Sequence, residues 1–178
     1  MERLSCCWRW NEPVKNVTPS FRQILERLAD GGLDFVIVGG YAALTHGSTL
    51  VTRDLDICAV LTPENVERLR KLLADWNPRH RMTAQRLSFL DHPAPGVPVR
   101  NLYLQTDYGV VDVLTSILGV GDFARLKEKA EVLEVEGREY RIIGLDDLIR
   151  AKEAVGREKD LLAAKELRAI AAKRGKVG

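Results

Sequence analysis

Three aspartates interrupt two of the most apolar strand-like segments, and this limits the fold more than any other feature. Asp54 and Asp56 open the segment 54–60, and Asp112 stands in the middle of the apolar segment 110–114. Alternate residues of a strand point to the same face, so Asp54 and Asp56 share one. Burying a carboxylate is costly unless it is paired or bound to a metal. If the two strands are neighbours in a sheet, all three carboxylates meet on one face.

That arrangement favours a divalent cation. Carboxylate oxygens are the ligands that Mg²⁺ prefers, and a cation between like charges relieves their repulsion. Three carboxylates on one face form the ligand set for two metal ions that act in phosphoryl or nucleotidyl transfer. Taken without Asp112, the Asp54-x-Asp56 pair is more simply interpreted as a solvated strand end.

A strand running into two glycines is the second feature. The β-rich segment 34–38 ends at Gly39-Gly40, and a short helix is expected over 41–46. Glycines let backbone amides approach a phosphate closely, and a helix N-terminus adds a favourable dipole. An ordinary tight turn is the alternative for the glycine pair alone.

The remaining pattern mixes helices and hairpins, so we expect an α/β (α+β) class with a mixed sheet. Thr18-Pro19 is typical of a helix start, and Gly31-Gly32 of a helix end. A Pro-rich stretch, 77–98, is expected to be mostly loop. Further helices are expected over 63–76, 145–155 and 158–173, and hairpins over 99–114 and 131–143.

Composition narrows the class of protein. The 178 residues suit one domain, and a net charge of +2 argues against a large basic face for duplex DNA. The longest apolar runs have strand length, and the N-terminus lacks the apolar stretch of a secretory signal. The sequence has three cysteines, the adjacent Cys6-Cys7 and the separate Cys58, and their spacing fits no disulfide or metal-binding pattern. We therefore expect the protein in a reducing cytoplasm.

Together these motifs resemble the nucleotidyltransferase superfamily that includes DNA polymerase β. The resemblance is carried by Gly39-Gly40, an Asp54-x-Asp56 strand after thirteen intervening residues, and a later strand with Asp112. It implies a nucleotidyltransferase-type mixed β-sheet flanked by helices, with a short C-terminal helical part. The sequence of residues 38–56 looks like that of the minimal prokaryotic branch of AbiEii-like, toxin-related and uncharacterised nucleotidyltransferases.

The C-terminal part is also similar to that branch. Lys152 followed by Gly156-Arg157-Glu158-Lys159-Asp160 looks like its Lys and Gly-Arg-x-Lys-Asp pattern. Two departures stand out, because Leu50 and Ala163 occupy positions where branch members often carry Arg and Asp. We divide the chain into an irregular arm (1–17), a nucleotidyltransferase core (18–143) and C-terminal helices packing on the core (144–178).

The resemblance implies a role for each motif. Gly39 and Gly40 would hold the triphosphate of an NTP such as ATP through their amides. Asp54, Asp56 and Asp112 would bind the metal, Mg²⁺ or alternatively Mn²⁺. Asp112 would also help to activate the acceptor hydroxyl.

Further polar residues are candidates for nucleotide contacts. Lys152 and Arg157 would offset the charge of the triphosphate, or they are ordinary solvated helix charges. Asp160 would orient one of them, or would cap its helix. The other candidates are Ser48, Thr52 and Arg53.

The resulting hypothesis is Mg-dependent transfer of an NMP from an NTP to a hydroxyl, with release of pyrophosphate. The acceptor is RNA, a protein or a small molecule. The alternative, kept open by Leu50, is a catalytically silent nucleotide-binding module that acts through a partner, such as an antitoxin.

Overall fold

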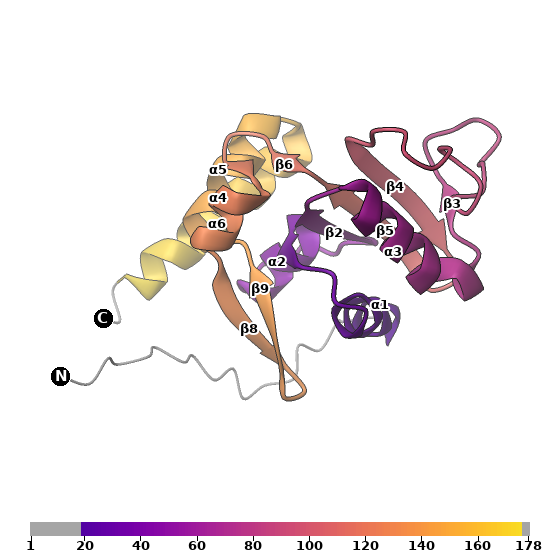
Figure 1. Ribbon diagram of the computed structural model, residues 1–178. Coiled ribbons are helices and arrows are strands. Elements are labelled where there is room, and N and C mark those ends of the chain that lie inside the picture. Colours follow the sequence, from indigo (N-terminus) through magenta and orange to yellow (C-terminus); the bar gives the residue numbers. More distant parts are fainter. Residues whose placement is uncertain (1–18, 176–178) are drawn as a thin grey trace.

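The computed structural model describes residues 19–175, so the arm predicted over 1–17 and the helix cap Thr18 lie outside the described residues (Figure 1). The helices are α1 (Pro19–Asp30), α2 (Gly39–Thr45), α3 (Pro63–Leu73), η1 (Ala74–Trp76), α4 (Phe123–Glu128), α5 (Leu145–Val155) and α6 (Glu158–Arg174). The strands are β1 (Phe35–Val38), β2 (Asp54–Ala59), β3 (Arg79–His80), β4 (Asn101–Thr106), β5 (Gly109–Leu114), β6 (Ser116–Ile117), β7 (Gly121–Asp122), β8 (Glu131–Val135) and β9 (Arg138–Ile142).

A mixed seven-stranded sheet with the order β3-β4-β5-β2-β1-β9-β8 forms the centre of the molecule. The β2–β5 and β1–β9 pairs are parallel, and the other neighbouring pairs are antiparallel. Strands β6 and β7 form a separate two-stranded sheet. The expected fold class and both expected hairpins are therefore confirmed, the first turning at residues 106–109 and the second at Glu136-Gly137.

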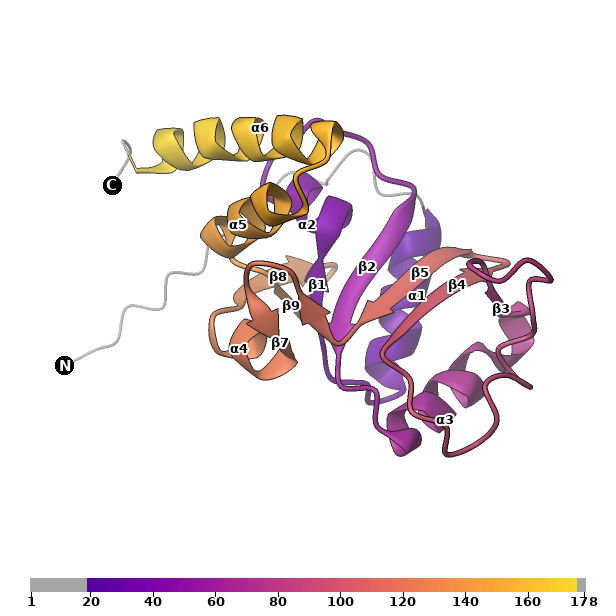
Figure 2. The ribbon, with the colours of Figure 1, turned by 90° about the horizontal axis from the view of Figure 1, so that it is seen from above.

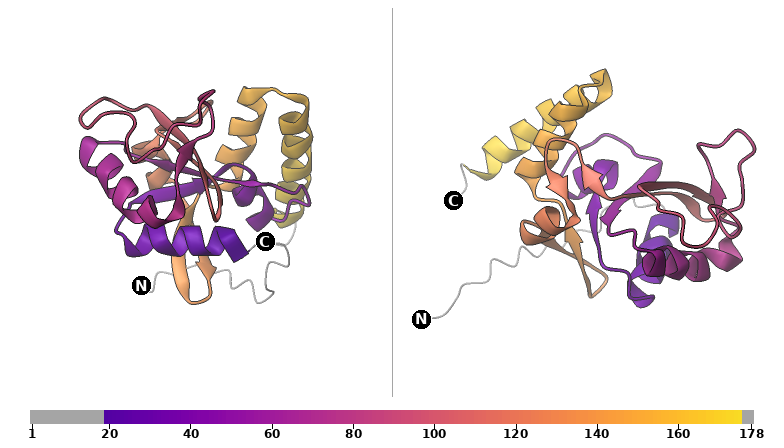
Figure 3. Two further views of the ribbon diagram at one scale, coloured as in Figure 1. Left: turned by 90° about the vertical axis from the view of Figure 1, so that its right-hand side faces the viewer. Right: turned by 45° about the horizontal axis from the view of Figure 1, so that its top comes forward.

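Helices flank the sheet (Figure 2 and Figure 3). Helices α1 and α3 lie together on one face (Figure 3), where they enclose inward-pointing strand residues that are fully buried. The helices α5 and α6 pack against each other as a hairpin to one side of the sheet, next to α2 (Figure 2). None of the helices between residues 19 and 175 is long and apolar enough to cross a membrane.

Several boundaries differ from the sequence prediction. The helix expected over 63–76 tightens into η1 at Ala74, and Asn77 then ends it in a left-handed conformation at φ 49°. Helix α2 begins at Gly39, because this glycine turns the chain at φ +66°. The stretch 77–98 is mostly loop as expected, but β3 adds an edge strand within it by pairing with β4.

Candidate active site

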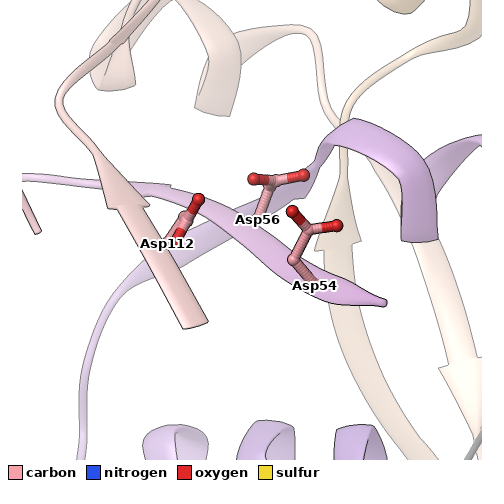
Figure 4. Close-up of side chains that lie close together, drawn as sticks. All are labelled: Asp54, Asp56 and Asp112. Atoms are coloured by element: carbon pink, nitrogen blue, oxygen red, sulfur yellow. The ribbon is translucent and has the colours of Figure 1, made fainter. Parts of the chain in front are cut away.

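The three aspartates lie at the centre of the sheet. Asp56 on β2 is the register partner of Asp112 on β5, and Asp54 lies two residues before Asp56 on β2. Their side chains project to the same side (Figure 4), and one carboxylate oxygen from each lies within 4.8 Å of the others. Neighbouring apolar residues such as Leu55 and Val111 point the other way, into the core. Alternation therefore separates the acidic face of these strands from their buried face.

The carboxylates raise one another's proton affinity. Burial, Asp54 and Asp112 together raise the pKa of Asp56 from 3.8 to about 7, although Lys152 and a hydrogen bond from the Gly40 amide lower it. Burial also raises the pKa of Asp112, and hydrogen bonds from Arg81 offset this only in part. Crowded carboxylates of this kind are stabilised by a cation.

The chemistry of this ligand set fits a divalent metal ion. Oxygen-only ligands with clustered negative charge are what Mg²⁺ and Mn²⁺ bind in proteins, whereas softer ions select His and Cys. Asp54, Asp56 and Asp112 would hold the ion, and the raised pKa of Asp56 shows how poorly the protein alone compensates these charges.

The glycine pair lies directly beside this cluster. A Cβ atom on Gly39 would stand 2.0 Å from Oδ2 of Asp56, and the residue adopts φ +66°. A Cβ on Gly40 would stand 2.5 Å from the hydroxyl oxygen of Thr52. Because both positions exclude a side chain, the start of α2 approaches the carboxylates closely enough for backbone amides to share a ligand with them.

The three loop candidates occupy different positions. Thr52 lies beside the cluster, where its hydroxyl donates to Oδ1 of Asp54 at 2.9 Å. The hydroxyl of Ser48 is buried and donates to Glu166 on α6 at 2.6 Å, so it fastens the loop to the C-terminal helix. Arg53 is exposed immediately before β2.

Asp160 orients the two C-terminal cations. Lys152 Nζ donates to Oδ1 of Asp160 at 3.0 Å, and Arg157 Nε donates to its Oδ2 at 2.6 Å. Asp160 is only 2% exposed, whereas the Arg157 side chain is 63% exposed. Lys152 also acts electrostatically on Asp56. Lys152 thus belongs to the carboxylate neighbourhood, while Arg157 lies at its solvent side.

Arg81 is the functional candidate that sequence reasoning missed. Its Nε donates to Oδ1 of Asp112 at 3.0 Å, and a second guanidinium nitrogen donates to Oδ2. Arg81 also lies over the ring of Tyr103, with its guanidinium carbon 5.5 Å from the ring centre. The only signal in the sequence was an arginine at the start of the Pro-rich stretch 77–98, and its distance from Asp112 along the chain hid the pairing.

The sequence matches no protein-family model and no curated protein at a significant level. Solved structures, in contrast, share the fold. The lincosamide antibiotic adenylyltransferase LnuA, solved with lincomycin bound, matches with a TM-score of 0.58 at 17% identity, over 87% of this chain and 99% of LnuA. A candidate nucleotidyltransferase from Thermotoga maritima matches with a TM-score of 0.53 at 15% identity, over 89% of this chain and 96% of its own.

The antibiotic-resistance factor ANT(2'')-Ia matches with a TM-score of 0.51 at 15% identity, over 89% of this chain and 91% of its own. The narrower resemblance to the AbiEii-like branch stays a prediction. At the level of architecture the expectation is confirmed: the chain has the fold of the nucleotidyltransferase superfamily.

Proposed function

We propose that the protein transfers an NMP from an NTP to an acceptor hydroxyl, with release of pyrophosphate. The observation that carries this proposal is the register of β2 and β5, which puts Asp56 beside Asp112 within a cluster of three carboxylates. The adjoining glycine pair and the nucleotidyltransferase fold support it. We further propose Mg²⁺ as the metal and ATP among the nucleotides.

The triphosphate binds on the α2 side of the carboxylates in this proposal. The start of α2 lies on that side, where the Gly40 amide hydrogen-bonds Asp56, and a helix start favours bound phosphate oxygens. Lys152 adds a positive charge there, and Asp160 holds its ammonium group in place. Thr52 orients Asp54 through its hydroxyl.

The reaction is an in-line displacement at the α-phosphorus. The acceptor oxygen forms a bond to the α-phosphorus as the bond to the bridging oxygen of the β-phosphate breaks, and pyrophosphate leaves. The hydroxyl proton passes to a carboxylate oxygen of Asp112, which Arg81 must release. A bound divalent ion would supply charge that acidifies the hydroxyl and neutralises the phosphates. Positioning and charge compensation therefore dominate over covalent chemistry by the protein.

Calorimetric titration of each of the four NTPs with Mg²⁺ tests the proposal. We expect metal-dependent binding to the wild type and its loss in Asp54→Ala/Asp56→Ala. The control Asp91→Ala/Glu128→Ala removes the same number of negative charges from exposed positions and should bind as the wild type does. An NTP that binds equally well to both double variants, or to neither the wild type nor the control, contradicts the proposal.

Turnover separates an enzyme from a silent binding module. With an α-labelled NTP and fractionated cell extract, the wild type should form a labelled product and pyrophosphate, and the active-site double variant should not. Binding without any transfer would favour the silent module that acts through a partner.

A further inference from the structure

Five side chains of neighbouring strands lie on the far side of Asp112 from the glycine pair, and we call them the acceptor surface: Arg79, Arg81, Asn101, Tyr103 and Gln105. They belong to β3, the residue that follows it, and β4. None of the five takes part in nucleotide binding as proposed above.

Strand register puts this surface on the same face of the sheet as the carboxylates. Tyr103 pairs with Asp112, which pairs with Asp56, and directly paired residues of neighbouring strands share a face. A second row lies two residues further along β4, where Gln105 pairs with Arg79 of β3 and with Val110 of β5. Val110 in turn pairs with Asp54 of β2. Two rows of side chains therefore lead from the sheet edge to the carboxylates.

Polar and aromatic groups make up these rows. Tyr103 is partly exposed, and its hydroxyl accepts a hydrogen bond from the Asn101 amide at 3.3 Å. The Arg81 backbone amide donates to the Tyr103 carbonyl at 2.9 Å, which holds Arg81 alongside β4. The Tyr103 ring, flanked along β4 by the amides of Asn101 and Gln105, is suited to the face and hydroxyls of a sugar-like ring once Arg81 no longer lies over it.

In-line attack assigns a ligand to this surface. The attacking oxygen and the departing pyrophosphate lie on opposite sides of the α-phosphorus. With the triphosphate on the α2 side of β2, the acceptor approaches from the β5–β4 side. That side is the acceptor surface.

Charge then narrows the class of acceptor. Residues 79–106 contain four arginines and a single acidic residue, Asp91. Two of those arginines, Arg79 and Arg81, belong to the acceptor surface, and Asp112 is the only acidic residue of β3, β4 and β5. A guanidinium binds phosphate or carboxylate groups through paired hydrogen bonds. A polyamine would meet these arginines without acidic partners beyond the proposed metal ligands.

We propose, building on the function proposed above, that the acceptor surface binds a small hydroxylated molecule carrying a phosphate or carboxylate group rather than a polycationic one. Tyr103 packs against its ring, and Arg79 binds its anionic group. Arg81 joins Arg79 in this role once it has released Asp112.

Three sugars of one ring size test this inference: glucose 6-phosphate, glucose and glucosamine. Each is titrated into the full-length protein with Mg²⁺ and the non-reactive nucleotide α,β-methylene-ATP, and binding is followed by ligand-observed NMR. We expect glucose 6-phosphate to bind at least about 10-fold more tightly than glucosamine, which corresponds to about 1.4 kcal/mol. In Arg79→Glu this ratio should fall to about one or invert.

The control Lys71→Glu makes the same charge change at an exposed position of α3 and should keep the ratio. Tyr103→Ala should weaken the binding of all three sugars by the same factor, because it removes stacking and not charge. Equal or tighter binding of glucosamine by the wild type overturns the inference, as does an equal effect of Arg79→Glu and Lys71→Glu. If the nucleotide binds but the sugars are not discriminated, only this inference fails; if the nucleotide does not bind, the proposed function fails with it.

Discussion

Asp56→Asn should stabilise the metal-free protein at neutral and alkaline pH while abolishing nucleotide transfer. In the folded state the pKa of Asp56 is raised to about 7 by burial and by Asp54 and Asp112. Because this value exceeds that of the unfolded chain, the ionised carboxylate opposes folding. The penalty is absent below about pH 4, grows between about pH 4 and pH 7, and is complete above that.

The size of the effect follows from the shift. A rise from 3.8 to about 7 is about three units, or about 4 kcal/mol at 1.36 kcal/mol per unit. Asparagine keeps an oxygen that can accept from the Gly40 amide, so the variant removes charge with little loss of hydrogen bonding. For a chain of this size the gain corresponds to about 10 °C in melting temperature.

Thermal or urea unfolding of both proteins at pH 4 and pH 8, in the presence of a chelator, measures this gain. Asp91→Asn, an exposed aspartate in the 77–98 stretch, is the control and should change neither value. Added Mg²⁺ should stabilise the wild type and leave Asp56→Asn nearly unchanged, because binding to the folded state alone raises stability. Equal gains at the two pH values, or no gain at pH 8, would refute the assignment of Asp56 as an uncompensated charge.

Three other variants probe the surroundings of the cluster. Gly39→Ala should cost about 1–2 kcal/mol of folding stability through left-handed strain alone. Its methyl carbon would lie 2.0 Å from Oδ2 of Asp56 and would displace that carboxylate, so calorimetry should also find Mg²⁺ binding lost. Asp160→Asn should destabilise the fold by about 3 kcal/mol in chemical unfolding, since it leaves Lys152 without its buried counter-charge. Burial raises the pKa of Asp160, but hydrogen bonds from Lys152 and Arg157 lower it overall. The loss of stability in the variant should therefore vanish as the pH falls below the pKa of an ordinary aspartate. Glu166→Gln should weaken the attachment of residues 48–49 to α6 by about 1–2 kcal/mol, and hydrogen exchange should increase there and not in β8.

Much of the site follows from local pattern. Alternation along one strand places Asp54 and Asp56 on the same face whatever surrounds them, and the apolar residues between and after them select the buried side. Likewise, Gly39 at the end of an apolar strand predicts a turn and a close backbone approach before any neighbour is known. These features depend on residues a few positions apart, and backbone geometry alone relates them.

The partners of these residues depend on the tertiary structure. Parallel pairing of β2 with β5 decides that Asp112 stands beside Asp56, and the path of the 77–98 stretch decides that Arg81 reaches Asp112. Folding of α6 against the core draws Ser48 to Glu166, a contact that the pattern of a polar loop does not reveal. Strand register and helix packing bring together segments far apart in the chain. The sequence therefore shows which charged groups are present, and the tertiary packing determines which of them lie beside the carboxylates.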